Sequence, residues 1–334
     1  MKTRRSTKLF ATVAAASLVL AACGGDDDDS GSESTAEGTS ESTAEETGEM
    51  TEEATGEMTE EETGEMTEEE ATEETGETTT PVNGDGVAYG NAQEFSNYNN
   101  TLAAANSVKN TIVLTEVQPS TFNFAGPTGE LMMDAEFLDA ANVVSDDPQV
   151  IEYVVNADAV WSDGEPIDCD DFYFDWAVQN GTVVQLDDSG APLVDEESGA
   201  ELLLFDVVST GGNEDIASVE CSDDGKTITT TYSTIYADWR ALFTSLMPAH
   251  IIEAQSGVED SIAAFEADDR ASLEAMAEFF NNGWSVNPGE LKPVIMPSAG
   301  PLIIDSWEAG ASLTLVPNEN YYCTMANGPV TLRY

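Results

Sequence analysis

The segment from Gly24 to Thr80 most constrains how this 334-residue chain can fold. It contains no aromatic residue, no Lys and no Arg, and three Met are its only large apolar side chains. Such a segment cannot bury enough apolar surface to offset the conformational entropy that ordering would cost. An eight-residue unit recurs in it, first at Thr47–Ala54, which is too short for a repeat with its own core. We therefore expect this segment to be disordered.

The same segment is strongly acidic. It holds 23 acidic residues between Asp26 and Glu77, so mutual repulsion should extend the chain and make it a spacer. Cation binding is the alternative function, but the tract has none of the loop pattern that calcium sites use.

An apolar run from Leu9 to Ala22 precedes this acidic segment and follows four basic residues at the N-terminus. The run is too short to span a bilayer and has the composition of a signal peptide. It ends in Leu20-Ala21-Ala22-Cys23, which resembles the bacterial lipobox. This resemblance implies that Cys23 carries a lipid and anchors the chain to the membrane. An ordinary signal peptide with an incidental cysteine is the alternative, and the Arg4-Arg5 pair leaves twin-arginine export open.

These features predict three parts: a lipoprotein signal peptide at 1–22, a disordered acidic tether at 23–85 and a folded part at 86–334. From Pro81 onward, 42 acidic residues stand against six basic ones. Phosphate backbones would be repelled by such a surface, so we expect no nucleic-acid binding. The folded part is long enough for a large core. In an exported protein Cys169 and Cys221 are candidates for a disulfide, which leaves Cys323 without a partner.

Local patterns in the folded part predict a mixed α/β fold without strict alternation of strands and helices. A helix should follow Asp168, which can cap it, with Asp170 and Asp171 in the first turn and an aromatic stripe behind. Trp176 belongs to this stripe, and burial is favoured over ligand stacking. The expected strands are 110–115, 150–155, 226–232, 300–307 and 313–316. Besides the helix after Asp168, the expected helices are 238–247, 261–266 and 272–282.

Several blocks of this sequence together resemble family 5 of the extracellular solute-binding proteins. The first is Trp161-Ser162-Asp163-Gly164-Glu165-Pro166-Ile167, followed by Asp170-Asp171-Phe172 and Trp176. The blocks that follow in the expected order are Pro248–Ile251, with the appearance of a helix end, Gly300–Ile304 and Leu313–Tyr322.

The resemblance implies the N-terminal part of a two-lobed fold like the type II periplasmic-binding proteins, with an incomplete first lobe plus a small subdomain. Family members are longer, so it also implies that the second lobe is missing and that this chain binds ligand weakly or not at all. The implied function is the lipid-anchored substrate-binding component of an ABC importer outside the cytoplasm. Peptides are its default cargo, and a permease and ATPase complex is its partner.

Most of the residues whose side chains could take part in catalysis or metal binding are interpreted as structural. The resemblance gives Trp161, the Asp163-Gly164 turn and Asp170 or Asp171 structural roles. Two residues in one tight turn point apart more often than together, so Asp163 and Glu165 are not expected to act as an acid–base pair. His250 lacks ligand-spaced neighbours, and no cofactor or metal motif is found, so we expect no enzyme, no catalytic residue, no cofactor and no metal. The family places an early strand near its cleft, which makes Tyr98, Asn99 and Asn100 candidate ligand-binding residues; a solvated loop is the alternative.

Two other classes of function remain open. One is a surface lipoprotein that acts as an interaction or structural module, or a fragment without function. The other is a hydrolase, which would need a nucleophile and a base brought together by the fold. Neighbouring permease and ATPase genes would favour import over an interaction module.

Overall fold

The structure, a computed structural model, describes residues 87–91, 93–125, 129–323 and 331–334. All of them fall within one unit of the chain, Glu74–Tyr334. The expected signal peptide, the lipobox with Cys23 and the whole of the expected tether lie outside the described residues. In the part that is described, no helix has the length and apolarity needed to cross a membrane.

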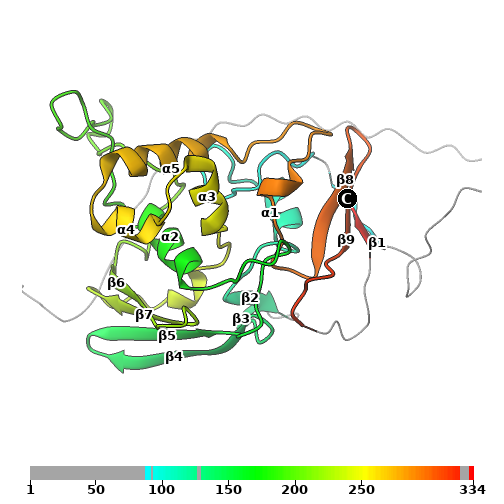
Figure 1. The fold of residues 1–334 in the computed structure, drawn as a ribbon, viewed down its shortest axis with the longest axis horizontal. Helices are drawn as coiled ribbons and strands as arrows, with labels where there is room; N and C mark the ends of the chain where they lie inside the picture. The colour runs from blue at the N-terminus through cyan, green and yellow to red at the C-terminus, as the bar shows by residue number, and fades with distance from the viewer. Residues whose placement is uncertain (1–86, 92, 126–128, 324–330) are drawn as a thin grey trace, which may run out of the picture. The chain divides into compact units, whose positions relative to one another are not determined.

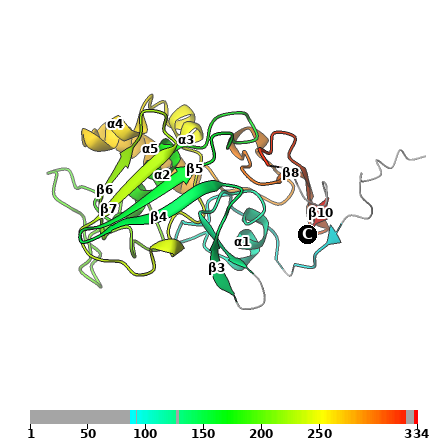
Figure 2. The same cartoon turned by 90° about the horizontal axis from the view of Figure 1, so that it is seen from below.

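One of the two hydrophobic cores lies beside a four-stranded antiparallel sheet with the order β4-β5-β7-β6 (Figure 2). Alternate residues of β5 are buried, as the period of two in a half-covered strand requires. One of them, Tyr153, packs against Phe172 of the central helix α2. The bounds of these elements are β4 Leu138–Asp146, β5 Gln149–Val155, β6 Ile216–Cys221, β7 Thr227–Tyr232 and α2 Cys169–Gln179.

A second sheet and a small hairpin complete the strands (Figure 1). The second sheet has the order β1-β10-β9-β8, and β1 pairs in parallel with β10. The hairpin pairs β2 with β3. The bounds are β1 Val87–Ala88, β2 Phe122–Ala125, β3 Glu130–Met133, β8 Leu302–Glu308, β9 Ser312–Pro317 and β10 Leu332–Arg333.

Helices α3, α4 and α5 pack on the side of α2 that faces away from the first sheet (Figure 1). The bounds of the helices are α1 Val108–Leu114, α3 Ala249–Ser256, α4 Ser261–Glu266 and α5 Arg270–Asn282, and the short 3-10 helices are η1 Trp239–Ala241 and η2 Pro293–Ile295.

Helix α2 contributes to two hydrophobic clusters. Phe172 and Ala177 belong to the cluster under the first sheet, whereas Phe174 and Val178 belong to the cluster built from α1, α3, α5, β8 and β9. A helix that is buried on more than one face has apolar residues around most of its circumference, which explains the run of aromatic residues in the sequence of α2.

The prediction of a strand at 110–115 is wrong, because these residues lie in or directly after helix α1. Their β-branched side chains favour a strand locally, but tertiary contacts decide otherwise. Buried Asn110 accepts a hydrogen bond from the backbone N–H of Ser96 at 2.9 Å and donates one to the carbonyl of Ala105 at 2.9 Å. Helical spacing then places Asn110, Val113 and Leu114 on the buried side.

The prediction of a helix over 238–247 is also wrong beyond its first turn. Only η1 forms, and Phe243 has a φ of 57°, a left-handed conformation that no α-helix tolerates. Thr121 holds the segment extended: its backbone N–H donates to the carbonyl of Phe243 at 3.1 Å and its hydroxyl to that of Leu242 at 2.9 Å.

The remaining predicted elements are confirmed, with one correction of role. The structure has strands at 150–155, 226–232, 300–307 and 313–316 and helices after Asp168 and at 261–266 and 272–282, each within a few residues. Pro248–Ile251, however, begins helix α3 and does not end one. Proline suits this position because a helix start leaves its backbone nitrogens unpaired in any case.

Candidate functional site

The first block of the family-like signature is held together by one buried carboxylate. Asp171 is fully buried and accepts three hydrogen bonds: from Trp161 Nε1 at 3.2 Å, from the backbone N–H of Asp168 at 3.3 Å, and from that of Ala249 at 2.9 Å. Burial raises the pKa of Asp171, and the three donors oppose that rise. Asp171 thus ties the start of α2 to the start of α3, which is a structural role.

The second block of the signature contacts the first. His250 in the first turn of α3 pairs through Nε2 with Asp163 Oδ2 at 3.0 Å, and its ring lies 6.3 Å from that of buried Trp161. The sequence places these blocks 87 residues apart, so spacing alone could not reveal the pair. Both side chains remain partly exposed, so their mutual attraction adds little to stability.

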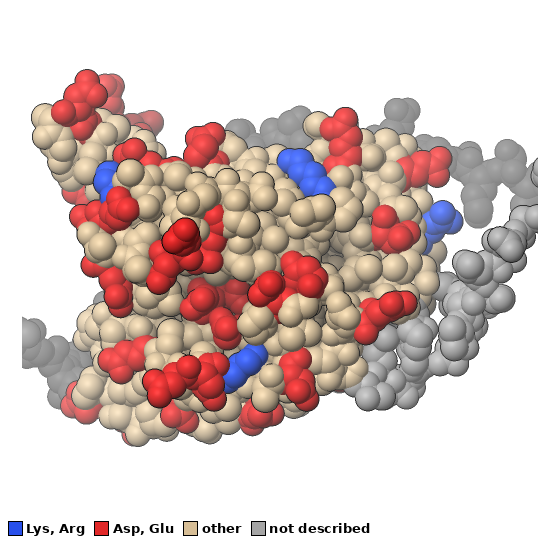
Figure 3. Space-filling view, viewed as in Figure 1, with Lys and Arg blue, Asp and Glu red and all other residues tan. Residues whose placement is uncertain are grey.

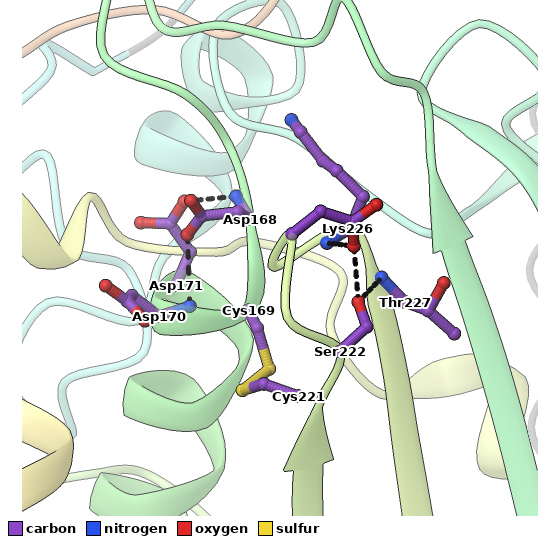
Figure 4. Close-up of a disulfide and its surroundings, with 9 residues drawn as sticks. Asp168, Cys169, Asp170, Asp171, Cys221, Ser222, Lys226 and Thr227 are labelled. Atoms are coloured by element: carbon purple, nitrogen blue, oxygen red, sulfur yellow. Dashed lines mark hydrogen bonds between the residues drawn. A yellow bond between two sulfur atoms is a disulfide. The ribbon is translucent and has the colours of Figure 1, made fainter.

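Cys169 at the start of α2 and Cys221 at the end of β6 form a disulfide with a Cα–Cα distance of 5.7 Å (Figure 4). This is the pair expected from the sequence. The backbone N–H of Cys169 also donates to the carbonyl of Gly225 in the turn between β6 and β7. Cys323 is a free cysteine. The disulfide therefore fastens the N-terminus of α2 to the edge of the first sheet.

Two adjoining cavities, of about 480 and 360 Å³, form what we call the polar groove. Both are lined by Asn100, Thr111, Ala241, Thr244 and Ser245, so they share one wall. The larger cavity extends toward α1 and the β2–β3 hairpin. The smaller one extends toward the C-terminal half of α2 and the loop at 208–213. Their volumes lie in the range of small-ligand sites.

The three residues predicted to bind ligand lie in different environments. Tyr98 is fully buried, stacks on Trp284 at 5.3 Å between ring centroids, and donates its hydroxyl proton to the carbonyl of Pro297. Asn99 is fully buried and accepts from Thr101. Only Asn100 lines the polar groove, and ligand contact by Asn100 remains a prediction.

The side chain of Asn100 also shapes the groove. It donates to Thr111 Oγ1 at 2.9 Å and accepts from the backbone N–H of Ser107 at 2.9 Å, which fixes the loop ahead of α1. Asn106 Nδ2 donates to the carbonyl of Asn100 at 2.9 Å. Asn100 therefore presents a preorganised surface to the groove.

Sequence reasoning missed Asp175 in α2, which lines the smaller cavity and is only 4% exposed. Its position in the sequence could have revealed it, because Asp175 lies among the aromatic, inward-facing residues of a predicted helix, and charged residues are rarely buried without a partner. Burial raises the pKa of Asp175 to about 7, and Gln179 lowers it to a smaller extent. Tyr236 is the only other titratable residue among the described residues that line this cavity.

The raised pKa of Asp175 predicts a pH-dependent stability. The folded carboxyl binds its proton more readily than the unfolded one, whose pKa is 3.8, so its contribution is complete below about pH 4 and is lost as pH rises to about 7. Because Asp175 lines a cavity that water can enter, we expect a loss on the order of 2 kcal/mol. Chemical denaturation at pH 5 and pH 8 should show this extra loss in the wild type and not in Asp175→Asn. Equal losses in both proteins would contradict it.

Comparisons with known proteins agree with this architecture. A family model described as bacterial extracellular solute-binding proteins, family 5 Middle, matches residues 136–333. An uncharacterized lipoprotein of Mycobacterium tuberculosis is 30% identical over 212 residues, which cover 61% of this chain and 34% of the relative. The oligopeptide-binding protein OppA of the same species is 27% identical over 201 residues, or 59% of this chain and 26% of OppA.

Solved structures extend the likeness to three dimensions. The periplasmic EDTA-binding protein EppA matches with a TM-score of 0.58 and 29% identity, over 76% of this chain and 40% of EppA. The oligopeptide-binding protein AppA from Bacillus subtilis, solved with a nonapeptide, matches with a TM-score of 0.52 and 13% identity over the same shares, and this likeness concerns the fold alone.

The mixed α/β fold thus matches solute-binding proteins over about 40% of their length. The chain spans about a third of the length of the first curated relatives that it matches. Since the family model covers more than half of its residues, the chain belongs to the bacterial extracellular solute-binding proteins of family 5.

Proposed function

We propose that this chain belongs to the substrate-binding component of an ABC importer outside the cytoplasm, and that the polar groove is a surface on which it binds peptides. Family membership supports the binding role, and a relative named as an oligopeptide-binding protein supports peptides as the ligand class. The polar groove carries the proposal, because two adjoining cavities lined by polar side chains among apolar surface suit an extended ligand with many hydrogen-bonding groups. A membrane permease with its ATPase would receive the ligand.

Reversible holding, with no chemical change to the ligand, is the activity that this groove suits. Thr244 and Ser245 line both cavities, and their hydroxyl groups can donate to or accept from a peptide backbone. Asn100 is already fixed by its own hydrogen bonds, so its position costs no ordering when a ligand arrives.

Peptide binding to the purified protein is expected to be localised to the polar groove. Dissociation constants between about 1 mM and 1 μM correspond to about 4 to 8 kcal/mol of binding free energy. Saturation-transfer NMR with a pool of tripeptides to hexapeptides measures this range. Thr244→Trp fills the groove and should abolish the signal.

Ser306→Trp is the matched control, because Ser306 is exposed on β8 and lines neither cavity. This variant should keep the wild-type signal. Absence of signal from the wild type, or an undiminished signal from Thr244→Trp, would contradict the proposed function.

We also propose that Cys23 carries a lipid and that the acidic segment holds the binding domain away from the membrane. The lipobox-like sequence supports this, as do relatives that are named lipoproteins. Metabolic labelling with an alkyne fatty acid in a bacterial host should mark the wild type and not Cys23→Ala. Cys323→Ala should be labelled like the wild type. Equal labelling of Cys23→Ala and wild type would refute lipidation at Cys23.

A further inference from the structure

The charged groups that line the polar groove are all acidic. Glu116 lines the larger cavity and Asp175 the smaller one, and among the described residues that line the two cavities none is Lys, Arg or His. Neither carboxylate takes part in an ion pair between described residues. Burial raises the pKa of both carboxyl groups, which reflects the cost of holding them here without a cation. The groove therefore disfavours anionic ligands.

Two further side chains supply acceptor atoms that have no partner. Asn213 is 4% exposed and lines the smaller cavity with Asp175, and its Oδ1 makes no hydrogen bond. Gln118 is 6% exposed and lines the larger cavity. Its Nε2 donates to the carbonyl of Tyr98 at 2.7 Å, which leaves Oε1 unbonded. Unpaired buried acceptors are costly, so a ligand that donates hydrogen bonds would relieve a penalty the protein already bears.

We propose that the polar groove selects ligands through a primary ammonium group, which binds in the smaller cavity beside Asp175 and Asn213. This inference rests on the proposed function and specifies its ligand. An ammonium group has three donors, no acceptor and a positive charge, so it complements a carboxylate and an amide oxygen in one cavity. A peptide offers such a group at its N-terminus or on a lysine side chain.

The wider surface favours the same ligands. From Pro81 onward the chain has 42 acidic and six basic residues, and acidic side chains are spread over the face shown in Figure 3. Three of these six basic side chains are already engaged. Lys226 donates to the carbonyls of Ala159 and Ile167, Lys292 to those of Gly283 and Ser285, and Arg270 pairs with Glu274. A negative potential of this kind raises the local concentration of cations near the groove.

Three small probes separate the two sources of the ammonium group. Trialanine amide carries a free N-terminus, acetyl-trialanine amide carries no charge, and acetyl-Ala-Lys-Ala amide carries only the lysine ammonium. Titration of each into the full-length mature protein at pH 7.5, followed by NMR, should show at least one charged probe binding about 10- to 100-fold more tightly than the uncharged one. Whichever charged probe gains identifies the source.

Asp175→Asn should bring the charged probes to nearly the same affinity as the uncharged one. Asp170→Asn is the matched control, since Asp170 is exposed in the first turn of the same helix, and it should keep the wild-type ratio. If the wild type binds the charged and the uncharged probes with nearly equal affinity, the inference is overturned. This measurement uses the wild type alone and does not depend on the folding of any variant.

A ratio that survives Asp175→Asn in a folded protein would overturn it too. In both of these outcomes the probes still bind, so peptide binding itself stands. Absence of binding by any probe, and by the tripeptide to hexapeptide pool, would instead remove the proposed function and this inference with it.

Discussion

Removal of the Cys169–Cys221 disulfide is expected to lower the free energy of unfolding by about 4 kcal/mol. The bond closes a loop between residues separated by 52 positions, and constraining a loop of that length removes about this much entropy from the unfolded chain. For a folded part of this size the loss corresponds to a fall in melting temperature of about 8–16 °C. Cys221 lies at the surface, so a reducing agent can reach the bond.

Thermal unfolding with and without a reducing agent, together with Cys169→Ala/Cys221→Ala, measures this effect. Cys323→Ala is the control: among the described residues its Sγ forms only weak hydrogen bonds, with the carbonyl of Glu136 at 3.5 Å and the Asn156 amide at 4.0 Å, so little change is expected. Mass spectrometry of non-reduced peptides gives a direct test, and free thiols at both Cys169 and Cys221 in the folded protein would remove the disulfide from the account.

Replacement of Asp171 by Asn is expected to destabilise the fold by about 3 kcal/mol. The amide retains one acceptor oxygen but turns an N–H group toward donors that met the second oxygen, so buried N–H groups lose their partners. The melting temperature should fall by about 6–12 °C. Differential scanning calorimetry of the variant measures the change.

Asp170→Asn serves as the comparison for this variant as well, because it makes the same chemical change one residue away on an exposed surface. Partial burial and neighbouring carboxylates raise the pKa of Asp170 to about 6, so removal of its charge should not destabilise the fold. If the two variants unfold at the same temperature, Asp171 does not hold α2 and α3 together in the manner described.

The sequence allowed good prediction where local signals and tertiary contacts agree. Asp168 was expected to cap α2, and it accepts from the backbone N–H of Asp170 at 3.2 Å in a complete capping box. The prediction of a strand at 110–115 failed because the β-branched side chains there favour a strand, while the hydrogen bonds of the buried Asn110 amide are made in a helix. Strand β4 was not predicted because its Asn, Asp and Ala residues give a weak strand signal, and pairing with β5 determines it.

The candidate site was harder to predict because its residues come from distant segments. Asn100 was identified because it lies early in the chain, where the family resemblance places a cleft. Asp175 comes from α2, Asn213 from a loop and Gln118 from the turn that follows α1, and only the fold brings them to adjoining cavities. The family-like blocks, by contrast, were interpreted as structural, and the contacts of Asp171 and His250 agree with that reading.

The position of α2 between two clusters has a consequence for how the domain comes apart. Phe172 and Phe174 are two residues apart and pack into different hydrophobic clusters, so α2 is part of both interiors. If the packing of either cluster is lost, α2 loses half of its packing contacts, and the other cluster is disturbed as well. The described part of the protein should therefore unfold in one cooperative step.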